Sequence, residues 1–539
     1  MYAMLRNHKE VLSMSTRRCL LPVLLCLPAV AWGAAPELPG VGAAMQAAVD
    51  AREVPGAVTV VVRKDQVVHL QATGLADIAG KKPMQPDSLF WIASMTKPVT
   101  AAAVLMLQDE GKLHVADPVA KHVPAFADLK TPSGKPANLT IAQILTHTSG
   151  LGEAPAAGAR EARTLADLVP LWLAAPMQFE PGARWQYSQS GINLAARIVE
   201  VVSGQAFDAF VQQRILDPLG MKHTTFYPAE GSVVTAYAKN VTTGDLEPTP
   251  ARADYGVRGH PPLGNGGLYS TGPDYARFCQ MLLGAGTLDG KRYLSPESMK
   301  LLTTVQTGDL PCGFLQSAEF GSRGASYGWG IGTCVLRARH DGVAAMLSPG
   351  TFGHGGAWGT QAWIDPIRGV AYVLMVQRSN FPNSDASNVR RAFQQAAADA
   401  LARTAGRDFA PNVLFVEHTQ EYQTIWNGNG GRVYLYQSEM PYDPPSQEAW
   451  RHGTVNGFAS YKVADHVTTH EAWGLGVYCF LSRAPVIADN GIETATAPGI
   501  KLHHLVTIRL GGGRAGSGIN HVINGTGDPV ITSMKATVE

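Results

Sequence analysis

The sequence predicts an α/β sandwich domain with a helical insertion, followed by a second, all-β domain. Residues 36–405 alternate helical hydrophobic periods with β-rich runs, and β-rich runs stand near both ends of this stretch, at 58–70 and 370–377. From 410 to 539 the helical periods give way to short β-rich runs and glycine clusters. We therefore expect an antiparallel sheet flanked by helices, with a helical subdomain inserted, and then β structure of unknown role.

Length and composition are consistent with this organisation and exclude several classes of protein. At roughly 100 to 200 residues per domain, 539 residues make two or more domains. The chain is 45% hydrophobic and 16% charged, which is typical of globular proteins. Its 44 basic and 43 acidic residues leave a net charge of +1. Composition therefore gives no electrostatic reason to expect a nucleic-acid or anionic-membrane partner.

Residues 1–35 have the organisation of a signal peptide. Arg17 and Arg18 precede an apolar run of the usual length, and small residues follow up to Ala35. The apolar run is too short to span a bilayer, so we expect no stable transmembrane anchor. Met14, just before the arginines, is an alternative start of translation. The segment predicts a secreted or periplasmic protein.

Four cysteines remain once this segment is removed, and the sequence leaves their state open. Cys312 and Cys334 flank a glycine-containing segment and would be bridged in an oxidising compartment. The alternative is that both, together with Cys279 and Cys479, pack as separate small hydrophobic residues. No Cys-x-x-Cys pair or metal-ligand spacing accompanies them.

Strands at the two ends of the first domain are expected to pair with each other. The runs at 58–63 and 67–70 predict a hairpin. The run at 370–377 predicts a buried strand, followed by a helix at 389–402. A sandwich in which N-terminal and C-terminal strands share one sheet accounts for this arrangement.

A serine and a lysine near residue 95 carry the first sign of chemistry. Pro98 is tolerated in the first turn of a helix, so the helix is expected to begin near Ser94 and to end at Gly111. Lys97 then lies one turn beyond Ser94, on the same face. A desolvated lysine can take the proton of a serine hydroxyl, because burial lowers its pKa.

Two further segments are candidates for the same site. Tyr187 follows a turn and precedes a helix through 194–202, and it could supply a phenolate if two neighbouring cations, Lys97 and a third group, lower its pKa. Residues 352–365 predict a strand whose glycines let a substrate lie close. There His354 could donate a hydrogen bond or carry a titratable charge.

In chain order, Ser94-x-x-Lys97, Tyr187-Ser188-Gln189 and His354-Gly355-Gly356 resemble the motifs of the serine β-lactamase and penicillin-binding protein clan. The resemblance is closest to its class C-like branch of esterases, D-amino-acid peptidases and amidases, and covers about residues 40–402. It implies a β-lactamase/transpeptidase-like sandwich. It also implies that Ser94 forms an acyl-enzyme and that Lys97 and Tyr187 share the acid and base roles.

The resemblance further implies an oxyanion hole made by the backbone N–H groups of Ser94 and Ala357, and no metal or organic cofactor. The other substrate-binding residues that it implies are Gln189, His354, Gly355 and Gly356.

Two departures from the clan's pattern favour small esters, or small amides, over β-lactams. Gln189 stands where class C β-lactamases carry asparagine, which displaces the amide by one methylene. His354 stands where they carry lysine, and histidine is mostly neutral at neutral pH, whereas the carboxylate of a β-lactam favours a permanent cation.

Two alternatives stay open. One is a β-lactamase or a D-amino-acid peptidase or D,D-carboxypeptidase acting on cell-wall-like substrates. The other is a non-catalytic penicillin-binding or receptor-like protein, against which the intact Ser94, Lys97 and Tyr187 argue.

Other prominent residues have structural interpretations. We expect His147 to pack in a turn, Asn265 to be a turn residue, and 327–332 to form an edge strand near the site, with Trp329 in the core.

The domain at 410–539 shows no tandem repeat. Three tryptophans suit either a carbohydrate-binding surface or a core, and five histidines match no usual zinc spacing. The domain could therefore bind carbohydrate or a cell surface, with no activity assigned. These residues are Trp426, Trp450, Trp473, His466, His470, His503, His504 and His521.

Overall fold

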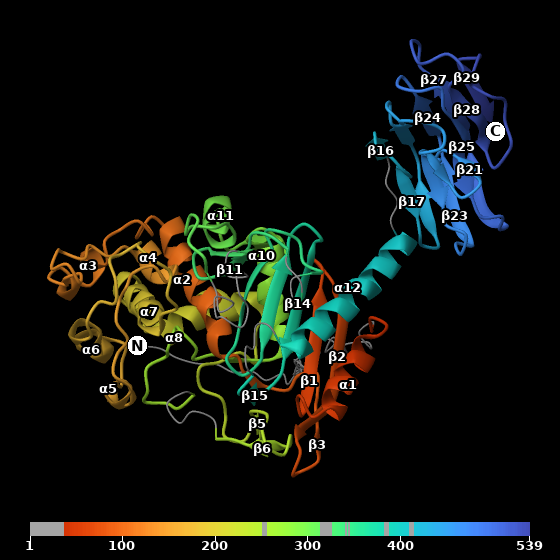
Figure 1. Ribbon diagram of the computed structural model, residues 1–539. Coiled ribbons are helices and arrows are strands. Elements are labelled where there is room, and N and C mark those ends of the chain that lie inside the picture. Colours follow the sequence, from red (N-terminus) through yellow and green to blue (C-terminus); the bar gives the residue numbers. More distant parts are fainter. Residues whose placement is uncertain are drawn as a thin grey trace, which may run out of the picture. The chain divides into compact units, whose positions relative to one another are not determined.

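The computed structural model describes residues 37–250, 256–312, 326–339, 342, 345–381, 387–408 and 414–539 (Figure 1). The expected signal peptide at 1–35 lies outside the described residues. Within the described ranges, every helix is too short or too polar to cross a membrane.

The first domain is built on an eight-stranded sheet in the order β10-β11-β12-β13-β14-β1-β2-β3, in which all neighbours are antiparallel. The central strand β1 pairs with β2 as a hairpin and with β14 from the far end of the domain, so the pairing across the chain is confirmed. The edge strand β10 is the one expected near 327–332. The strands are β1 Gly56–Val62, β2 Val67–Asp77, β3 Lys82–Pro83, β10 Tyr327–Trp329, β11 Cys334–Leu336, β12 Phe352–Gly355, β13 Gln361–Asp365 and β14 Val370–Met375.

Both faces of the sheet are buried, which explains why β1 is buried at every position and apolar except at Thr59. Side chains of a strand alternate between faces, and Val58 and Val60 enter one core while Ala57 and Val61 enter the other. Helices α1 (Val41–Asp50) and α12 (Asn388–Asp408) cover the second core and lie side by side in Figure 1. Helices α2 (Thr96–Asp109) and α10 (Gly272–Leu283) cover the first.

A helical subdomain connects β4 with β7 and packs on α2. Its central helix is α7, and its shorter helices surround it. The elements are β4 Phe90–Trp91, α3 Val119–His122, α4 Ile141–Leu145, α5 Ala156–Glu161, α6 Val169–Ala174, α7 Gln189–Ser203, α8 Phe207–Val211, α9 Asp217–Leu219, β5 Tyr237–Lys239, β6 Leu246–Pro248 and β7 Tyr269–Ser270. Beyond α10 follow β8 Thr287–Leu288, β9 Lys291–Arg292 and α11 Pro296–Thr303, and β15 Arg378–Ser379 follows β14.

The expected single strand at 352–365 is wrong: it is a hairpin. Strand β12 ends at Gly355, the chain turns through Gly356–Thr360, and β13 returns antiparallel beside it. Gly359 takes a φ of 92° in this turn, a conformation that favours glycine. The turn places Ala357 as the exposed residue of an otherwise buried segment.

The second domain is all-β, as expected, and is a parallel β-helix. Successive coils each add a strand to three parallel sheets around one core. The first sheet holds β16 Leu414–Glu417, β19 Tyr436–Glu439, β24 Leu475–Cys479 and β27 Leu505–Arg509, closed by the antiparallel β29 Lys535–Val538. The second holds β17 Thr424–Trp426, β22 Tyr461–Val463, β25 Ile487–Thr494 and β28 Gly518–Ile523, and the third holds β18 Gly431–Val433, β23 Thr469–Trp473 and β26 Gly499–His503. The short hairpin of β20 Arg451–His452 and β21 Val455–Asn456 stands outside them.

The coils are unequal in length, which hides the structural repeat from the sequence. Gly431 pairs with His470 one coil on, whereas Thr469 pairs with the nearer Gly499. The β-rich residues at 502–509 are divided at His504, whose φ is 56°, because the chain passes there from β26 in the third sheet to β27 in the first.

The side chains singled out in this domain divide between core and surface. Trp426 and Trp450 are buried in its core, and His470 is hydrogen-bonded to Tyr461. Trp473 stacks between Tyr434 and His503 on the third sheet, with ring centroids 5.1 and 5.4 Å away. The four cysteines, Cys279, Cys312, Cys334 and Cys479, are buried and form no disulfide within the described residues, so of the two alternatives the separate thiols are present here.

We expect Val60→Ala to lower the stability of the first domain by about 2 kcal/mol, because Val60 is fully buried in the centre of the sheet. Thermal unfolding of the full chain measures the effect. Val241→Ala is the matched control, since Val241 is 95% exposed and its truncation should leave the transition in place. Equal effects of the two changes would contradict this account of the core.

Candidate active site

The lysine of the Ser-x-x-Lys motif is buried at the point where three polar groups converge. Lys97 is 0% exposed, and its Nζ lies 2.9 Å from Ser94 Oγ, 3.1 Å from Gln189 Oε1 and 2.6 Å from the carbonyl oxygen of Asn265. It also stands 4.6 Å above the centroid of the Tyr187 ring. Helix α2 supplies Lys97, and the turn before β7 supplies Asn265.

This environment favours the neutral amine. Burial holds the pKa of Lys97 well below its usual value, and the opposing attraction of Glu153 is the smaller effect. A neutral amine has two hydrogens and one lone pair. The Gln189 and Asn265 oxygens can only accept, so the two hydrogens go to them and the lone pair faces the hydroxyl of Ser94.

Ser94 is the accessible residue of a buried segment. It is half-buried, whereas its neighbours from Phe90 to Thr100 are buried. Ala93 before it has a φ of 44°, a left-handed conformation that costs energy and is common beside functional residues. Thr96 Oγ fixes this bend by donating to the carbonyl oxygen of Ala93 at 2.7 Å. Helix α2 then begins at Thr96, close to the expected start, and Gly111 ends the segment with a φ of 69°.

The β12–β13 turn comes so close to this segment that only glycine fits at 356. A Cβ on Gly356 would lie 2.1 Å from Thr360 Oγ1 and 2.6 Å from the carbonyl oxygen of Ile92. Gly356 therefore allows the close approach of these two segments, and its contact with a substrate stays a prediction. Next to it Ala357 is exposed, as an oxyanion-hole donor must be.

An aromatic cluster holds Tyr187. The rings of His147 and Trp329 lie 4.5 and 6.3 Å from it, and Trp185 lies 6.2 Å away, all measured between centroids. His147 Nδ1 accepts the backbone N–H of Ser188 at 3.1 Å. His147 thus packs in a turn, as expected, and Trp329 is buried against it at 5.0 Å.

His354 is neutral and oriented as an acceptor. Its Nδ1 lies 2.6 Å from the carbonyl oxygen of Gly355, so Nδ1 carries the proton. Nε2 is then an acceptor, and the Tyr187 hydroxyl lies 3.5 Å from it. Burial lowers the pKa of His354 to about 3. Burial also lowers the pKa of Lys97, so neither Lys97 nor His354 supplies the permanent cation that a phenolate at Tyr187 was expected to need.

Gln189 and Asn265 form a pair that the sequence did not reveal. Gln189 Oε1 accepts from Asn265 Nδ2 at 2.8 Å as well as from Lys97. The longer side chain of Gln189 therefore still reaches the lysine. Asn265 is in a turn, as expected, but it also contacts two site residues; the glycines around it, at 264, 266 and 267, were the available signal.

A carboxylate fixes the start of the helix that carries Gln189. Glu153 accepts the backbone N–H groups of Gln189 and Ser190 at 2.7 and 2.9 Å. Ser188 Oγ accepts the N–H of Gly191 at 3.1 Å. These acceptors satisfy the unpaired donors of the first turn of α7, and so hold the Tyr187–Gln189 segment in place.

Comparison with known proteins places this site in a family. The Beta-lactamase family model matches residues 41–397. Protein Rv1367c of Mycobacterium tuberculosis is 33% identical over 372 residues, covering 63% of this chain and 90% of that protein. Esterase EstB of Burkholderia gladioli is 30% identical over 350 residues, covering 60% and 86%. The solved structure of EstCE1, a hydrolase with promiscuous acyltransferase activity, shares the fold, with a TM-score of 0.56 at 23% identity over 66% of this chain and 97% of its own.

Two other matches cover shorter parts of the chain and belong to different kinds of protein. A LAM55 pectate lyase-like domain model matches residues 369–439, which include the first strands of the β-helix. An exo-beta-1,3-glucanase of Streptomyces is 41% identical over 142 residues, which are 26% of this chain and 23% of that enzyme.

We expect Gly356→Ala to lower kcat by about 10² to 10³, because the added Cβ displaces the turn that carries Ala357 and its backbone donor. Steady-state hydrolysis of a p-nitrophenyl ester measures it. Gly80→Ala is the control, since a Cβ there meets nothing closer than 3.6 Å. Wild-type kcat in a folded Gly356→Ala protein would contradict the assignment.

The pH dependence of kcat/KM should reflect the titration of the Lys97 amine and not that of the His354 imidazole. As the pH rises, deprotonation of Lys97 raises the rate to a plateau, at a pH well below the usual pKa of lysine. His354, with a pKa of about 3, adds no inflection between pH 5 and 8. A limb near pH 6.5 that disappears in His354→Asn would overturn this.

Proposed function

This chain is a serine hydrolase of the β-lactamase family, and from that premise we propose that it is exported and cleaves small esters through an acyl-Ser94 intermediate. The observation that carries the proposal is the buried amine of Lys97. Its Nζ lies 2.9 Å from the hydroxyl of Ser94, and its two other hydrogen bonds go to oxygen atoms that can only accept.

Acylation begins when Ser94 Oγ attacks the carbonyl carbon of the ester. The hydroxyl proton passes to the lone pair of Lys97 Nζ, and the carbonyl oxygen takes the negative charge. The backbone N–H groups of Ser94 and Ala357 stabilise that oxyanion. The C–O bond to the alcohol then breaks, and the alcohol leaves with the proton from Lys97, either directly or through Tyr187.

Deacylation repeats these steps with water. A water molecule gives a proton to the neutral amine of Lys97 and adds to the acyl carbon, and the proton returns to Ser94 Oγ as the acid leaves. Lys97 Nζ keeps its hydrogen bonds to Gln189 Oε1 and to the carbonyl oxygen of Asn265 during both acylation and deacylation. The site therefore needs no rearrangement between the two half-reactions.

His354 supports esters over β-lactams as substrates. The carboxylate of a β-lactam is best met by a fixed cation, and a buried imidazole with a pKa of about 3 supplies none. Neutral esters need no such partner.

Small amides are the second candidate. Both contacts of the Gln189 side chain in the described part of the structure use its Oε1, so its amide nitrogen is available to a substrate carbonyl. That donor would suit an amide substrate, including a D-amino-acid peptide.

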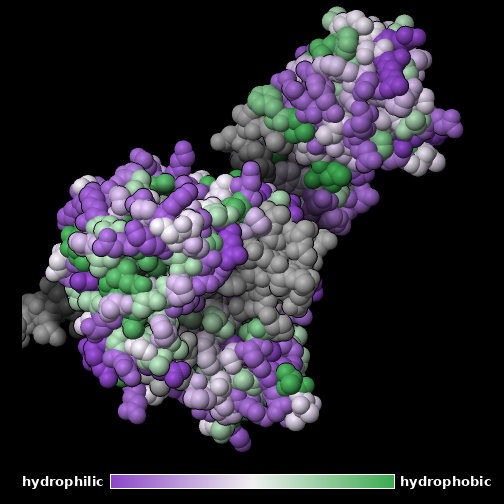
Figure 2. All heavy atoms as spheres, turned by 60° about the vertical axis from the view of Figure 1, so that its left-hand side comes forward, coloured by the Kyte–Doolittle hydropathy of each residue, from purple (hydrophilic) through white to green (hydrophobic). Residues whose placement is uncertain are grey.

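Two proposals concern the rest of the chain. The basic and apolar segment at 1–35 supports export to the periplasm or outside the cell. The β-helix, with the similarity of part of the chain to an exo-beta-1,3-glucanase, supports a role in binding carbohydrate or a cell surface. On the face shown in Figure 2, hydrophilic and hydrophobic residues are interspersed.

With p-nitrophenyl butyrate we expect a burst of one nitrophenolate per protein, followed by turnover, and a butyryl group on Ser94 in intact mass. Ser94→Ala should abolish all three, whereas Ser133→Ala, an exposed serine, should change none. Nitrocefin should be hydrolysed slowly. A folded protein with neither burst nor turnover would refute the proposal, and rapid nitrocefin hydrolysis would refute the inference from His354.

A further inference from the structure

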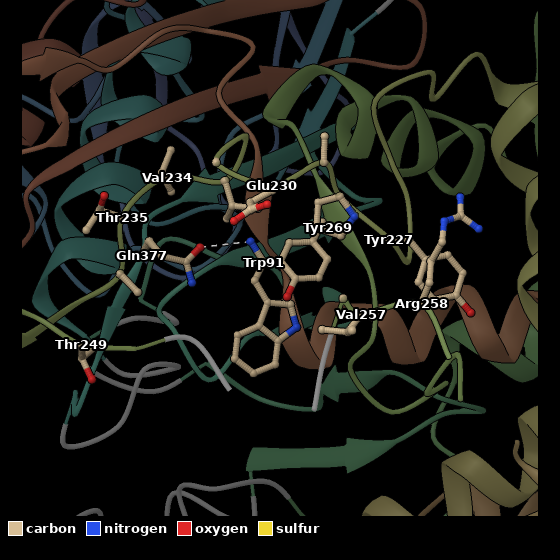
Figure 3. Close-up of a pocket in the computed structure, with 16 residues that line it drawn as sticks. Trp91, Tyr227, Glu230, Val234, Thr235, Thr249, Val257, Arg258, Tyr269 and Gln377 are labelled. Carbon is tan, nitrogen blue, oxygen red and sulfur yellow. Dashed lines mark hydrogen bonds between the residues drawn. The ribbon is translucent and has the colours of Figure 1, made fainter. Parts of the chain in front are cut away.

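A large cavity lies beside the nucleophile segment and has no part in the steps above. Its volume is about 680 Å³, within the range of small-molecule sites. Trp91 and Tyr269 form one wall, and the loop at 227–236 and residues 249 and 256–258 form the others (Figure 3). We call it the Trp91 cavity.

The wall of this cavity contacts the segments that carry the proposed catalytic groups. Trp91 stands three positions before Ser94 and pairs with Tyr269 across β4 and β7. Its indole Nε1 donates to the carbonyl oxygen of Gly266 at 2.6 Å, in the same turn that holds Lys97 through Asn265. Its ring lies 5.7 Å from that of Trp358, which follows the oxyanion residue Ala357.

The position of the cavity points to the acyl side of a substrate. The groups that exchange protons with the leaving alcohol, Lys97 and Tyr187, are held by α7 and the aromatic cluster, and neither lines the cavity. The cavity instead adjoins the segment before Ser94 and the residue after Ala357. An acyl group bound to Ser94 has its carbonyl oxygen in the oxyanion hole, so its chain extends away from the proton-transfer groups.

One polar side chain gives the largely apolar wall a specific feature. Gln377 is 2% exposed and lines the cavity, and its Oε1 accepts the backbone N–H of Trp91 at 3.0 Å, which fixes the orientation of the amide. Among the described residues its Nε2 has no hydrogen-bond partner. Figure 3 shows this nitrogen turned away from the Trp91 backbone. Because Gln377 lines the cavity, this donor can pair with an acceptor on a bound ligand.

Among the described lining residues, the two charged side chains are Glu230 and Arg258, one acidic and one basic, and both are exposed. The rings of Trp91 and Tyr269 stack with their centroids 6.4 Å apart and form an aromatic part of the wall. These features favour a neutral ligand with an apolar, ring-sized body.

We propose that the Trp91 cavity binds the acyl group of the substrate, and that it takes a neutral, ring-sized acyl group whose hydrogen-bond acceptor meets Gln377 Nε2. This assignment rests on the proposed esterase function, since it names the substrate class of that site.

Binding to the inactive enzyme tests the assignment apart from turnover. Ser94→Ala should bind p-nitrophenyl 4-methoxybenzoate in calorimetric titration, and adding Thr249→Trp, which fills the cavity from its half-buried rim, should weaken binding at least tenfold. Thr242→Trp, on an exposed loop, is the matched control and should not change it. Equal affinity of the Thr249→Trp and control proteins would refute the cavity as the acyl site.

Turnover separates the two proposals. In the active protein, Thr249→Trp should lower kcat/KM for the 4-methoxybenzoate at least tenfold more than for p-nitrophenyl acetate. Gln377→Leu should raise KM for the 4-methoxybenzoate more than for the unsubstituted benzoate, because only the former carries the extra acceptor. If wild type cleaves acetate through Ser94 but neither variant discriminates, the cavity assignment fails and the esterase function stands. If no ester is cleaved, the esterase function fails.

Discussion

The burial of the Lys97 amine is the constraint on which the rest of the site depends. An ammonium ion out of water is costly, and the neutral amine that burial favours is the form that can take a proton from Ser94. The structure holds that amine with two acceptors from different parts of the chain, one on α7 and one in the turn before β7. Helix α2, buried on all sides from Thr96 to Leu107, keeps water out.

Close backbone packing fixes the segments that surround Ser94. Gly356 brings the end of the sheet against Ile92, and Ala93 takes a strained conformation one residue before the nucleophile. The hydroxyl, its base and the exposed backbone of Ala357 thus come from segments whose positions are set by contact and not by flexible side chains. Preorganised donors of this kind need no rearrangement when negative charge develops.

Local features of the fold and the site were predictable from sequence, and distant contacts were not. Ser94 and Lys97 are one helical turn apart, and the β1–β2 hairpin follows from two β-rich runs only a few residues apart, so both could be predicted directly. The pairing of Asn265 with Gln189, and of Gln377 with Trp91, joins residues far apart in the chain, and a single sequence gives no sign of such contacts. The titration state of His354 depends on burial by a surrounding cluster. The β-helix was missed because its coils differ in length, so no fixed period marks them.

The pairing of β1 with β14 also sets an order in which the chain acquires its structure. Val58 cannot pair with Met375 until nearly the whole first domain has been synthesised. Strand β1 therefore has β2 beside it early, but lacks β14 on its other side until that point. The β-helix pairs only between adjacent coils and can assemble one coil at a time. The domain that contains the nucleophile therefore closes only after β14 has been made, whereas each coil of the β-helix can pair with the coil before it as soon as it is made.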